Sequence, residues 1–249
     1  DAMLRHSVGI TEKKYGMVVR SVDSIIKDLK VIKKYTNRIF ISYESDMKLM
    51  KELLKRISKD KDLKNYFYIT YGAWKVLDKE IVYLLRDAFR FDSDKSIIEI
   101  SPEVFDEVDR KLIKSGGVYY SNKQYFRAID NIKKILGSKV KVVLFYSRYH
   151  KTHNSFDKLI EEYKNLIEFR DKLKHINYKF DYTHVATDVG SQYWQEYINN
   201  PREVDSFIRE LKRLDKTSKE TGIHFGNLCF YFPKELEIED VLKFEMVIY

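Results

Sequence analysis

Residues 66–101 read YFYITYGAWKVLDKEIVYLLRDAFRFDSDKSIIEIS, and this stretch decides the fold class. Its two ends, 66–71 and 96–101, are short runs rich in β-branched and aromatic residues, a composition typical of strands that are covered on both faces. Between them, residues 78–90 repeat apolar side chains at helical spacing. A strand, a helix and a second strand in this order predict two parallel strands joined by a right-handed crossover.

The same alternation continues along the chain, which predicts a single parallel sheet of six strands. Six strands are too few for a closed eight-stranded barrel, so a partial barrel or an open doubly wound sheet fits the pattern. We expect a partial (β/α)6 barrel of the TIM type over residues 1–232, followed by a C-terminal extension, 233–249, that begins a further segment. The remaining strands are expected at 39–41, 139–146, 178–187 and 223–232, and the remaining helices at 21–34, 46–58, 103–112, 122–136, 155–174 and 202–219.

Composition restricts the class of protein. The formal net charge is +8 with both signs interspersed, and no block of five like charges marks a nucleic-acid-binding tail. The single cysteine, Cys229, excludes an internal disulfide and favours the cytosol. We see no signal peptide and no apolar run of about 20 residues, so we expect a cytoplasmic protein without a membrane span. A start at Asp1 and an apolar end at Tyr249 suggest a piece of a longer polypeptide.

Polar residues follow the predicted strands, where parallel α/β folds place their chemistry. Five of these residues would share one rim of the sheet: Glu44, Glu103, Arg148, His150 and Asp188. The sequence contains no glycine-rich phosphate loop, no zinc-binding cysteine pair and no nucleophile elbow. His150 and His153 have a spacing that metal ligands can use, but no carboxylate lies at a telling distance, and we expect no metal site.

Glu99 and Ser101 stand two residues apart in a predicted strand and should therefore face the same side. A glutamate in an apolar strand costs free energy unless it finds a partner. Glu99 is either a site residue, a buried structural hydrogen-bonding group, or a residue that points outward under a helix. Trp74 follows another strand and either stacks on a ligand or covers the core.

Several segments together resemble the radical S-adenosylmethionine superfamily, in particular its cobalamin-binding branch. Members often read E-I-S-P-E-S, then R-K-L, then Y-Y-S-N-E-E, then a helix and K-V. The segments that match this pattern are Ile98-Glu-Ile-Ser-Pro-Glu103, Arg110-Lys-Leu112, Tyr119-Tyr-Ser-Asn122 and Lys139-Val140. Three more segments resemble other positions of the family: Arg20-Ser-Val22, Ile39-Phe-Ile-Ser-Tyr-Glu44 and Asp188-Val-Gly-Ser191. The resemblance spans about residues 17–197.

The resemblance implies that the cofactor-binding residues hold S-adenosylmethionine, and it implies a [4Fe–4S] cluster and, in this branch, cobalamin. The protein would orient these groups while they carry the chemistry. We therefore expect the core of an enzyme that performs methyl transfer or related radical chemistry, with a cobalamin-binding domain upstream and an unidentified small-molecule or peptide substrate. The resemblance implies that Ser42, Tyr43 and Glu44 contact the amino group of S-adenosylmethionine. It places Glu99, Ser101 and Glu103 near the ribose, and Val185 and Asp188 near the adenine. Arg148 stands in the fifth-strand loop, Ser147-Arg-Tyr-His150, which lacks the family's glycines.

One departure is decisive for activity. The family's C-x-x-x-C-x-x-C loop, which follows the first strand, is absent, and one cysteine cannot supply the three thiolates of a cluster. This chain should lack the first strand and the cluster loop and be inactive as an isolated piece. Two other functions stay open: a degenerate barrel that binds a nucleotide-like ligand or a partner, and a nucleic-acid-binding α/β protein suggested by the charge and the 19 tyrosines. We do not expect a nucleic-acid partner.

Overall fold

The structure is a computed structural model, and it describes residues 20–42, 46–73, 75–114, 119–173, 178–184, 209, 212–213, 215–221, 233 and 235–248. The chain divides into two compact units, and we treat each by itself. The sheet unit contains Val19–Tyr146 and Lys164–Tyr182. The C-terminal unit contains Ser147–Tyr163 and the described residues from Thr183 onward.

Strands and helices alternate as the sequence predicts. Five strands form one sheet in the order β1-β2-β3-β4-β5, and the first three neighbouring pairs are parallel. The elements are α2 (Val22–Ile32), β1 (Arg38–Ser42), α3 (Met47–Lys59), β2 (Tyr68–Ala73), α4 (Lys79–Ala88), β3 (Ile97–Glu103), α5 (Glu107–Ile113), α6 (Asn122–Leu136), β4 (Lys141–Arg148), α7 (Phe156–Lys172), β5 (Tyr178–His184) and α10 (Ile238–Ile248).

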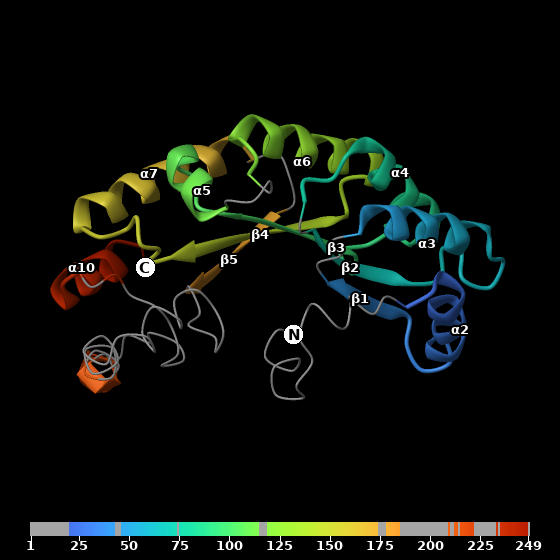
Figure 1. The fold of residues 1–249 in the computed structure, drawn as a ribbon, viewed down its shortest axis with the longest axis horizontal. Helices are drawn as coiled ribbons and strands as arrows, with labels where there is room; N and C mark the ends of the chain where they lie inside the picture. Colours follow the sequence, from blue (N-terminus) through green and yellow to red (C-terminus); the bar gives the residue numbers. More distant parts are fainter. Residues whose placement is uncertain are drawn as a thin grey trace, which may run out of the picture. The chain divides into compact units, whose positions relative to one another are not determined.

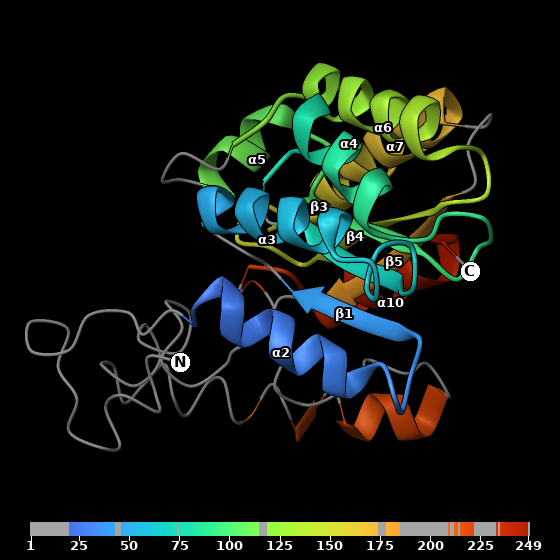
Figure 2. The ribbon, with the colours of Figure 1, turned by 90° about the vertical axis from the view of Figure 1, so that its right-hand side faces the viewer.

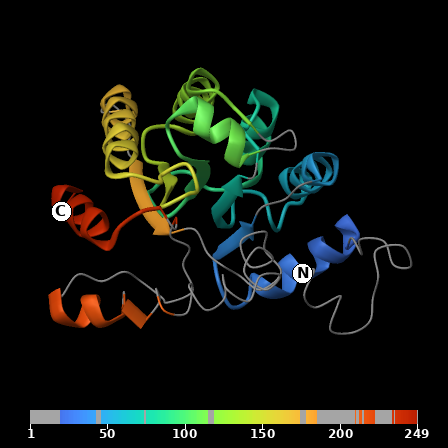
Figure 3. The same cartoon turned by 60° about the vertical axis from the view of Figure 1, so that its left-hand side comes forward.

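The strand order distinguishes the two architectures that the sequence left open. In a doubly wound sheet the strand order reverses once and the helices lie on both faces. Here the order follows the sequence, and α3, α4 and α6 lie on the same face of the sheet (Figure 1, Figure 2 and Figure 3). This is the winding of a partial TIM-type barrel, and within the described residues its sheet is open. The predicted sixth strand, 223–232, lies outside the described residues.

Short polar side chains set where the helices begin. Ser21, Asp46, Asp78 and Asp106 each accept a hydrogen bond from a backbone amide in the first turn of α2, α3, α4 and α5. Ser121 forms a reciprocal capping box with Gln124 at the start of α6. Such caps satisfy backbone amides that have no partner within the helix, and each contributes about 1 kcal/mol.

The main core lies between the sheet and these helices. Register places Tyr71, Ile98 and Val142 in one row across β2, β3 and β4, and none of them is more than 1% exposed. Leu54 of α3 and Ile81 of α4 are fully buried as well. We call the face that carries this row the helix-covered face. Burying each large apolar side chain contributes about 1.5–3 kcal/mol, so this layer is the main source of the unit's stability.

Several predicted element ends differ from the observed ones by two residues or more, and two of these differences affect residues of the candidate site. The helix expected at 103–112 begins only at Glu107, because Glu103 still belongs to β3 and Asp106 caps the helix. The strand expected at 139–146 runs instead from Lys141 to Arg148. Ser147 and Arg148, which we expected in the following loop, are therefore strand residues.

The C-terminal unit has its own apolar cluster. Leu159 of α7 packs with Val241 and Phe244 of α10 and with Tyr149, which follows β4. The rings of Tyr163 and Phe244 meet edge to face at a centroid distance of 6.1 Å. This cluster ties α10 to the first half of α7, whereas the domain boundary expected at residue 232 stays a prediction. Within the described residues, no helix is long and apolar enough to span a membrane.

Candidate functional site

The opposite face of the sheet, which we call the second face, is less completely buried than the helix-covered face. Register aligns Phe40, Thr70, Ile97 and Lys141 in one row across β1 to β4. Phe40 is 59% exposed, and the other three residues are half-buried. Because successive side chains of a strand alternate between the faces, the residues two positions further along each strand lie on this same face.

The next row on the second face contains two of the predicted cofactor contacts. Ser42 is in register with Gly72, Gly72 with Glu99, and Glu99 with Val143. With strands about 4.8 Å apart, the Cα positions of Ser42 and Glu99 are about 10 Å apart. Gly72 stands between them without a side chain. The backbone of Gly72 is buried, and it lies between a half-buried glutamate and the last residue of β1.

Further along β3, a β-bulge separates Glu103 from Glu99. Ile100 is in register with Leu144, but Glu103 is in register with Tyr146, so β3 has one extra residue. Glu103 has a φ of 67°, a left-handed conformation uncommon for a residue with a side chain. The bulge moves Glu103 into a row of the helix-covered face, where its carboxylate lies 3.7 Å from Nζ of Lys114.

Arg110 of α5 holds the bulged end of β3 in place. Its side chain is fully buried. Its Nε donates to the carbonyl oxygens of Pro102 and Val104 at 3.2 and 2.8 Å, and its terminal nitrogens donate to the carbonyl of Tyr120 and to Oδ1 of Asn122 at 3.0 and 2.6 Å. Its sequence position alone gave Arg110 no predicted role. The signal that could have found it was an arginine within the segment that resembles the family, in the helix expected after a strand that carries site residues.

Two further side chains converge on the carbonyl oxygen of Ser101. Nζ of Lys114 and the hydroxyl of Tyr125, at 3.3 Å, both donate to it. Burial lowers the pKa of Lys114 below its ordinary value, and Glu103 opposes this shift. Burial also raises the pKa of Tyr125. Ser101 itself is 7% exposed, and its backbone is fixed from the helix-covered side.

Arg148, the last residue of β4, is engaged within the C-terminal unit. Its Nη1 lies 2.8 and 2.7 Å from the two carboxylate oxygens of Glu245 in α10. The two side chains are 5% and 4% exposed. The hydroxyl of Tyr149 donates to the same carboxylate. This ion pair gives Arg148 a structural partner that sequence reasoning did not foresee, and its role in cofactor binding stays a prediction.

The structure brings together some of the predicted site residues and does not describe others. Tyr43, Glu44, Val185 and Asp188 lie outside the described residues, as does Trp74. The rings of His150 and His153 are buried and meet edge to face at a centroid distance of 5.8 Å. Within the described part of the chain, no group of three or more histidine, cysteine, aspartate or glutamate side chains is placed to hold a metal ion.

Comparison with known proteins gives one kind of match. No protein-family model matches the chain, and no curated protein matches it. Two solved structures of TsrM, a radical S-adenosylmethionine methyltransferase from Kitasatospora setae, are similar in fold. The structure with tryptophan substrate and the S-adenosylmethionine analogue aza-SAM bound has a TM-score of 0.51 at 12% identity, over 67% of this chain and 30% of that one. The structure with cobalamin and a [4Fe–4S] cluster bound has a TM-score of 0.48 at 13% identity, over 66% and 29%.

These comparisons bear on the fold. At 12% identity the match concerns architecture rather than side chains, and the chain spans less than a third of the length of the structures it matches. The strand order and the one-sided helix layer agree with that architecture. The resemblance inferred from the sequence is thereby confirmed at the level of fold: this chain shares the architecture of part of a cobalamin-binding radical S-adenosylmethionine methyltransferase.

Proposed function

We propose that this chain is the central part of a radical S-adenosylmethionine enzyme, and that the second face of its sheet binds S-adenosylmethionine. The observation that carries the proposal is the row Ser42–Gly72–Glu99. Two residues that the resemblance assigns to this cofactor stand in one row of one face, although 57 positions separate them in the sequence. The likeness in fold to a methyltransferase that binds an analogue of the same cofactor supports this reading.

The residues present fit a nucleoside ligand. The carboxylate of Glu99 can accept hydrogen bonds from both hydroxyls of a ribose, and bonds to a charged acceptor are stronger than neutral ones. A glycine such as Gly72 lets a ligand approach the backbone closely. Ser101, two residues beyond Glu99, lies where the register of β3 shifts, and its carbonyl is fixed by Lys114 and Tyr125. These residues would bind and orient the ligand.

The cluster does not fit this chain in the same way. A [4Fe–4S] cluster needs three thiolates, and the sequence has one cysteine. We therefore propose that the cluster, the cobalamin and an upstream cobalamin-binding domain are supplied by residues outside this sequence. The reaction we propose for the whole enzyme is methyl transfer or related radical chemistry. Residues 1–249 would contribute the binding face for S-adenosylmethionine.

The proposal is tested by equilibrium dialysis of the chain against radiolabelled S-adenosylmethionine. Glu99→Gln keeps the size of the side chain and removes its charge. Losing hydrogen bonds to a charged acceptor costs about 1.5–3 kcal/mol, so we expect the dissociation constant to rise at least about tenfold. Glu52→Gln is the matched control, because it makes the same change on the exposed side of α3.

Three results are informative. Saturable binding that Glu99→Gln weakens and Glu52→Gln leaves unchanged supports the proposal. Equal weakening by both variants would indicate an effect of net charge and would contradict it. An unmodified chain that binds no S-adenosylmethionine even at millimolar concentrations would remove the cofactor face from consideration.

A further inference from the structure

A second feature lies at the other end of the strands, where β1 and β2 begin. The residues there come from two segments, 30–38 and 59–66, which carry seven basic and two acidic side chains. Their net charge is +5, compared with +8 for the whole chain. We call this surface the basic end. Its charged residues are Lys30, Lys33, Lys34, Arg38, Lys59, Lys61 and Lys64, with Asp60 and Asp62.

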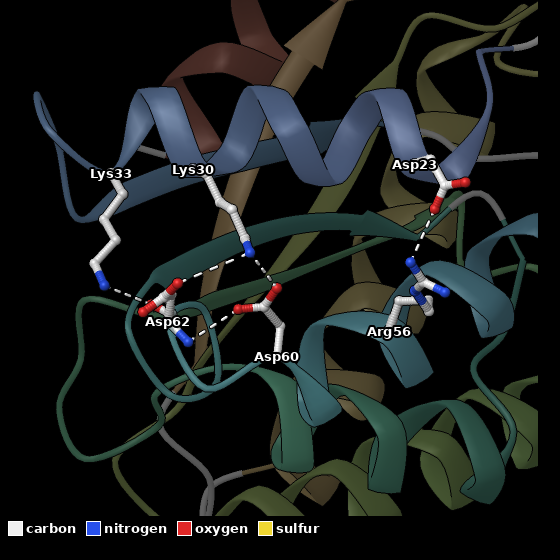
Figure 4. A network of polar contacts seen from close by, with 6 residues as sticks. All are labelled: Asp23, Lys30, Lys33, Arg56, Asp60 and Asp62. Carbon is white, nitrogen blue, oxygen red and sulfur yellow. Dashed lines mark hydrogen bonds and ion pairs between the residues drawn. The ribbon is translucent and has the colours of Figure 1, made fainter.

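Direct contacts hold the two segments against each other, so the basic end is one surface. Nζ of Lys33 donates to the carbonyl oxygen of Asp62 at 2.6 Å, and the hydroxyl of Tyr66 donates to the carbonyl of Lys33 at 3.0 Å. Lys30 lies 2.8 Å from the carboxylate of Asp60, which raises the pKa of the lysine (Figure 4). The backbones of the two strands also meet here, in the pairing of Arg38 with Tyr68.

The net positive charge of the basic end exceeds what is needed to neutralise the negative ends of the neighbouring helices. Helices α2 and α3 both end at this surface, and each C-terminus carries about half a negative charge. Together they offset about one of the five net positive charges. Within the described residues, neither an ion pair nor a side-chain hydrogen bond is found for five of the seven cations: Lys34, Arg38, Lys59, Lys61 and Lys64. About four positive charges therefore remain in excess, and all five of these side chains are exposed.

An exposed aromatic ring lies among these cations. Tyr35 follows Lys34 directly and is 83% exposed, and no large hydrophobic residue of the described chain is more so. Val31, one helical turn before it, is 55% exposed. A tyrosine in this position adds nothing to the core. A flat ring beside several cations is the arrangement with which proteins stack a base and hold its phosphates.

From these observations we propose that the basic end binds single-stranded nucleic acid. Lys34, Arg38 and Lys61 neutralise phosphates, and Tyr35 stacks on a base. An acidic polypeptide would satisfy the charges but would leave the exposed ring without a role. The basic end begins at Arg38, and the proposed cofactor row includes Ser42, about 13 Å further along the same strand. Both sites can therefore be occupied, and the inference does not rest on the proposed cofactor.

The basic end differs from what the charge pattern of the sequence indicates. We expected no nucleic-acid partner partly because no block of five like charges occurs in the chain. The fold instead joins two shorter basic segments that are separated by β1 and α3. The surplus of charge becomes visible only when both segments are placed on one surface.

The test is fluorescence anisotropy with labelled oligouridylate of about 16 nucleotides, titrated over a series of salt concentrations. For single strands, each neutralised phosphate contributes about 0.7 to the slope of log K against log salt. The triple variant Lys34→Gln, Arg38→Gln, Lys61→Gln should reduce that slope by about 2 and weaken binding. Tyr35→Ala should raise the dissociation constant at least about fivefold and leave the slope unchanged.

A matched triple variant controls for net charge. Lys123→Gln, Lys134→Gln, Lys139→Gln removes the same charge from α6 and the turn after it, where all three lysines are exposed. A control that weakens binding as much as the first triple variant would overturn the proposal, as would an unmodified chain that binds no oligonucleotide at low salt. Equal competition by polyglutamate, with Tyr35→Ala without effect, would assign the surface to an acidic polypeptide instead. Glu99→Gln should bind the oligonucleotide normally, which separates this result from the cofactor proposal.

Discussion

Replacing Glu245 by leucine should destabilise the chain strongly, because the replacement leaves a buried charge without its partner. Arg148 and Glu245 are 5% and 4% exposed, and Nη1 of the arginine lies 2.8 and 2.7 Å from the two carboxylate oxygens. Removing one member of such a pair typically costs about 3–5 kcal/mol. We expect Glu245→Leu and Arg148→Met each to lower the free energy of unfolding by about this amount.

The double variant should cost much less than the sum of the single variants. When both charges are replaced by apolar side chains of similar volume, the desolvation penalty of the pair disappears with its attraction. The hydroxyl of Tyr149, which donates to Glu245, would lose its acceptor, at a cost of about 1–3 kcal/mol. We therefore expect the two single losses, about 6–10 kcal/mol together, to exceed the loss of the double variant by at least about 3 kcal/mol.

The assay is urea unfolding followed by circular dichroism, with all four proteins of the cycle measured under the same conditions. Lys158 and Glu161 provide a control cycle in the same unit, because their ion pair spans 2.7 Å but their side chains are 49% and 56% exposed. That pair should show a coupling below about 1 kcal/mol. Additivity of Arg148→Met and Glu245→Leu to within about 0.5 kcal/mol would refute the reasoning.

Three further changes test the site. Arg110→Lys keeps the positive charge but lacks the planar guanidinium that donates several hydrogen bonds at once, so we expect the free energy of unfolding in urea to fall by about 3 kcal/mol. The control, Lys111→Gln on the exposed side of α5, should change that free energy by less than about 0.5 kcal/mol. Burial raises the pKa of Tyr125 above its ordinary value of 10.0. Above that pH the unfolded chain releases a proton that the folded chain keeps, so the free energy of unfolding falls as pH rises. Tyr125→Phe should therefore lose less stability than the unmodified chain between about pH 9 and pH 11. Gly72→Val would place a side chain in the row next to Glu99 and should weaken binding of S-adenosylmethionine in dialysis, and unchanged affinity in a folded variant would contradict the proposed position of the ligand.

Local signals were sufficient wherever a segment determines its own structure. Helix α6 spans the predicted residues, 122–136, because Ser121 caps its start and Gly137, with a φ of 92°, ends it. Periodicity likewise located α3 and β2 to within about two residues. The start of α5 was misplaced because a β-bulge carries β3 beyond Pro102. A bulge depends on how two strands pair, and a single strand's pattern does not contain that information.

The candidate site likewise combines features that one strand determines with features that depend on the pairing of several strands. Alternation along β3 predicts that Glu99 and Ser101 share a face of the sheet, but it does not contain the register shift that lies between Ile100 and Glu103. The row of Ser42, Gly72 and Glu99 depends on the register between three strands. The partner of Arg148 is 97 residues away in the sequence. Contacts of that kind are set by the packing of whole elements, and one sequence alone does not determine them.

The bulge in β3 separates Glu99 from Glu103, two glutamates for which the resemblance implies the same role. In a regular strand, Glu99 and Glu103 would face the same side, four residues apart. Arg110 binds the carbonyl oxygens of Pro102 and Val104, on both sides of Glu103, and so maintains its left-handed backbone. Such a conformation costs about 1–3 kcal/mol, which two hydrogen bonds from a guanidinium can offset. Glu103 is thereby turned to Lys114 on the helix-covered face, whereas Glu99 stays in the row of Gly72 on the second face, where we propose that the ligand binds.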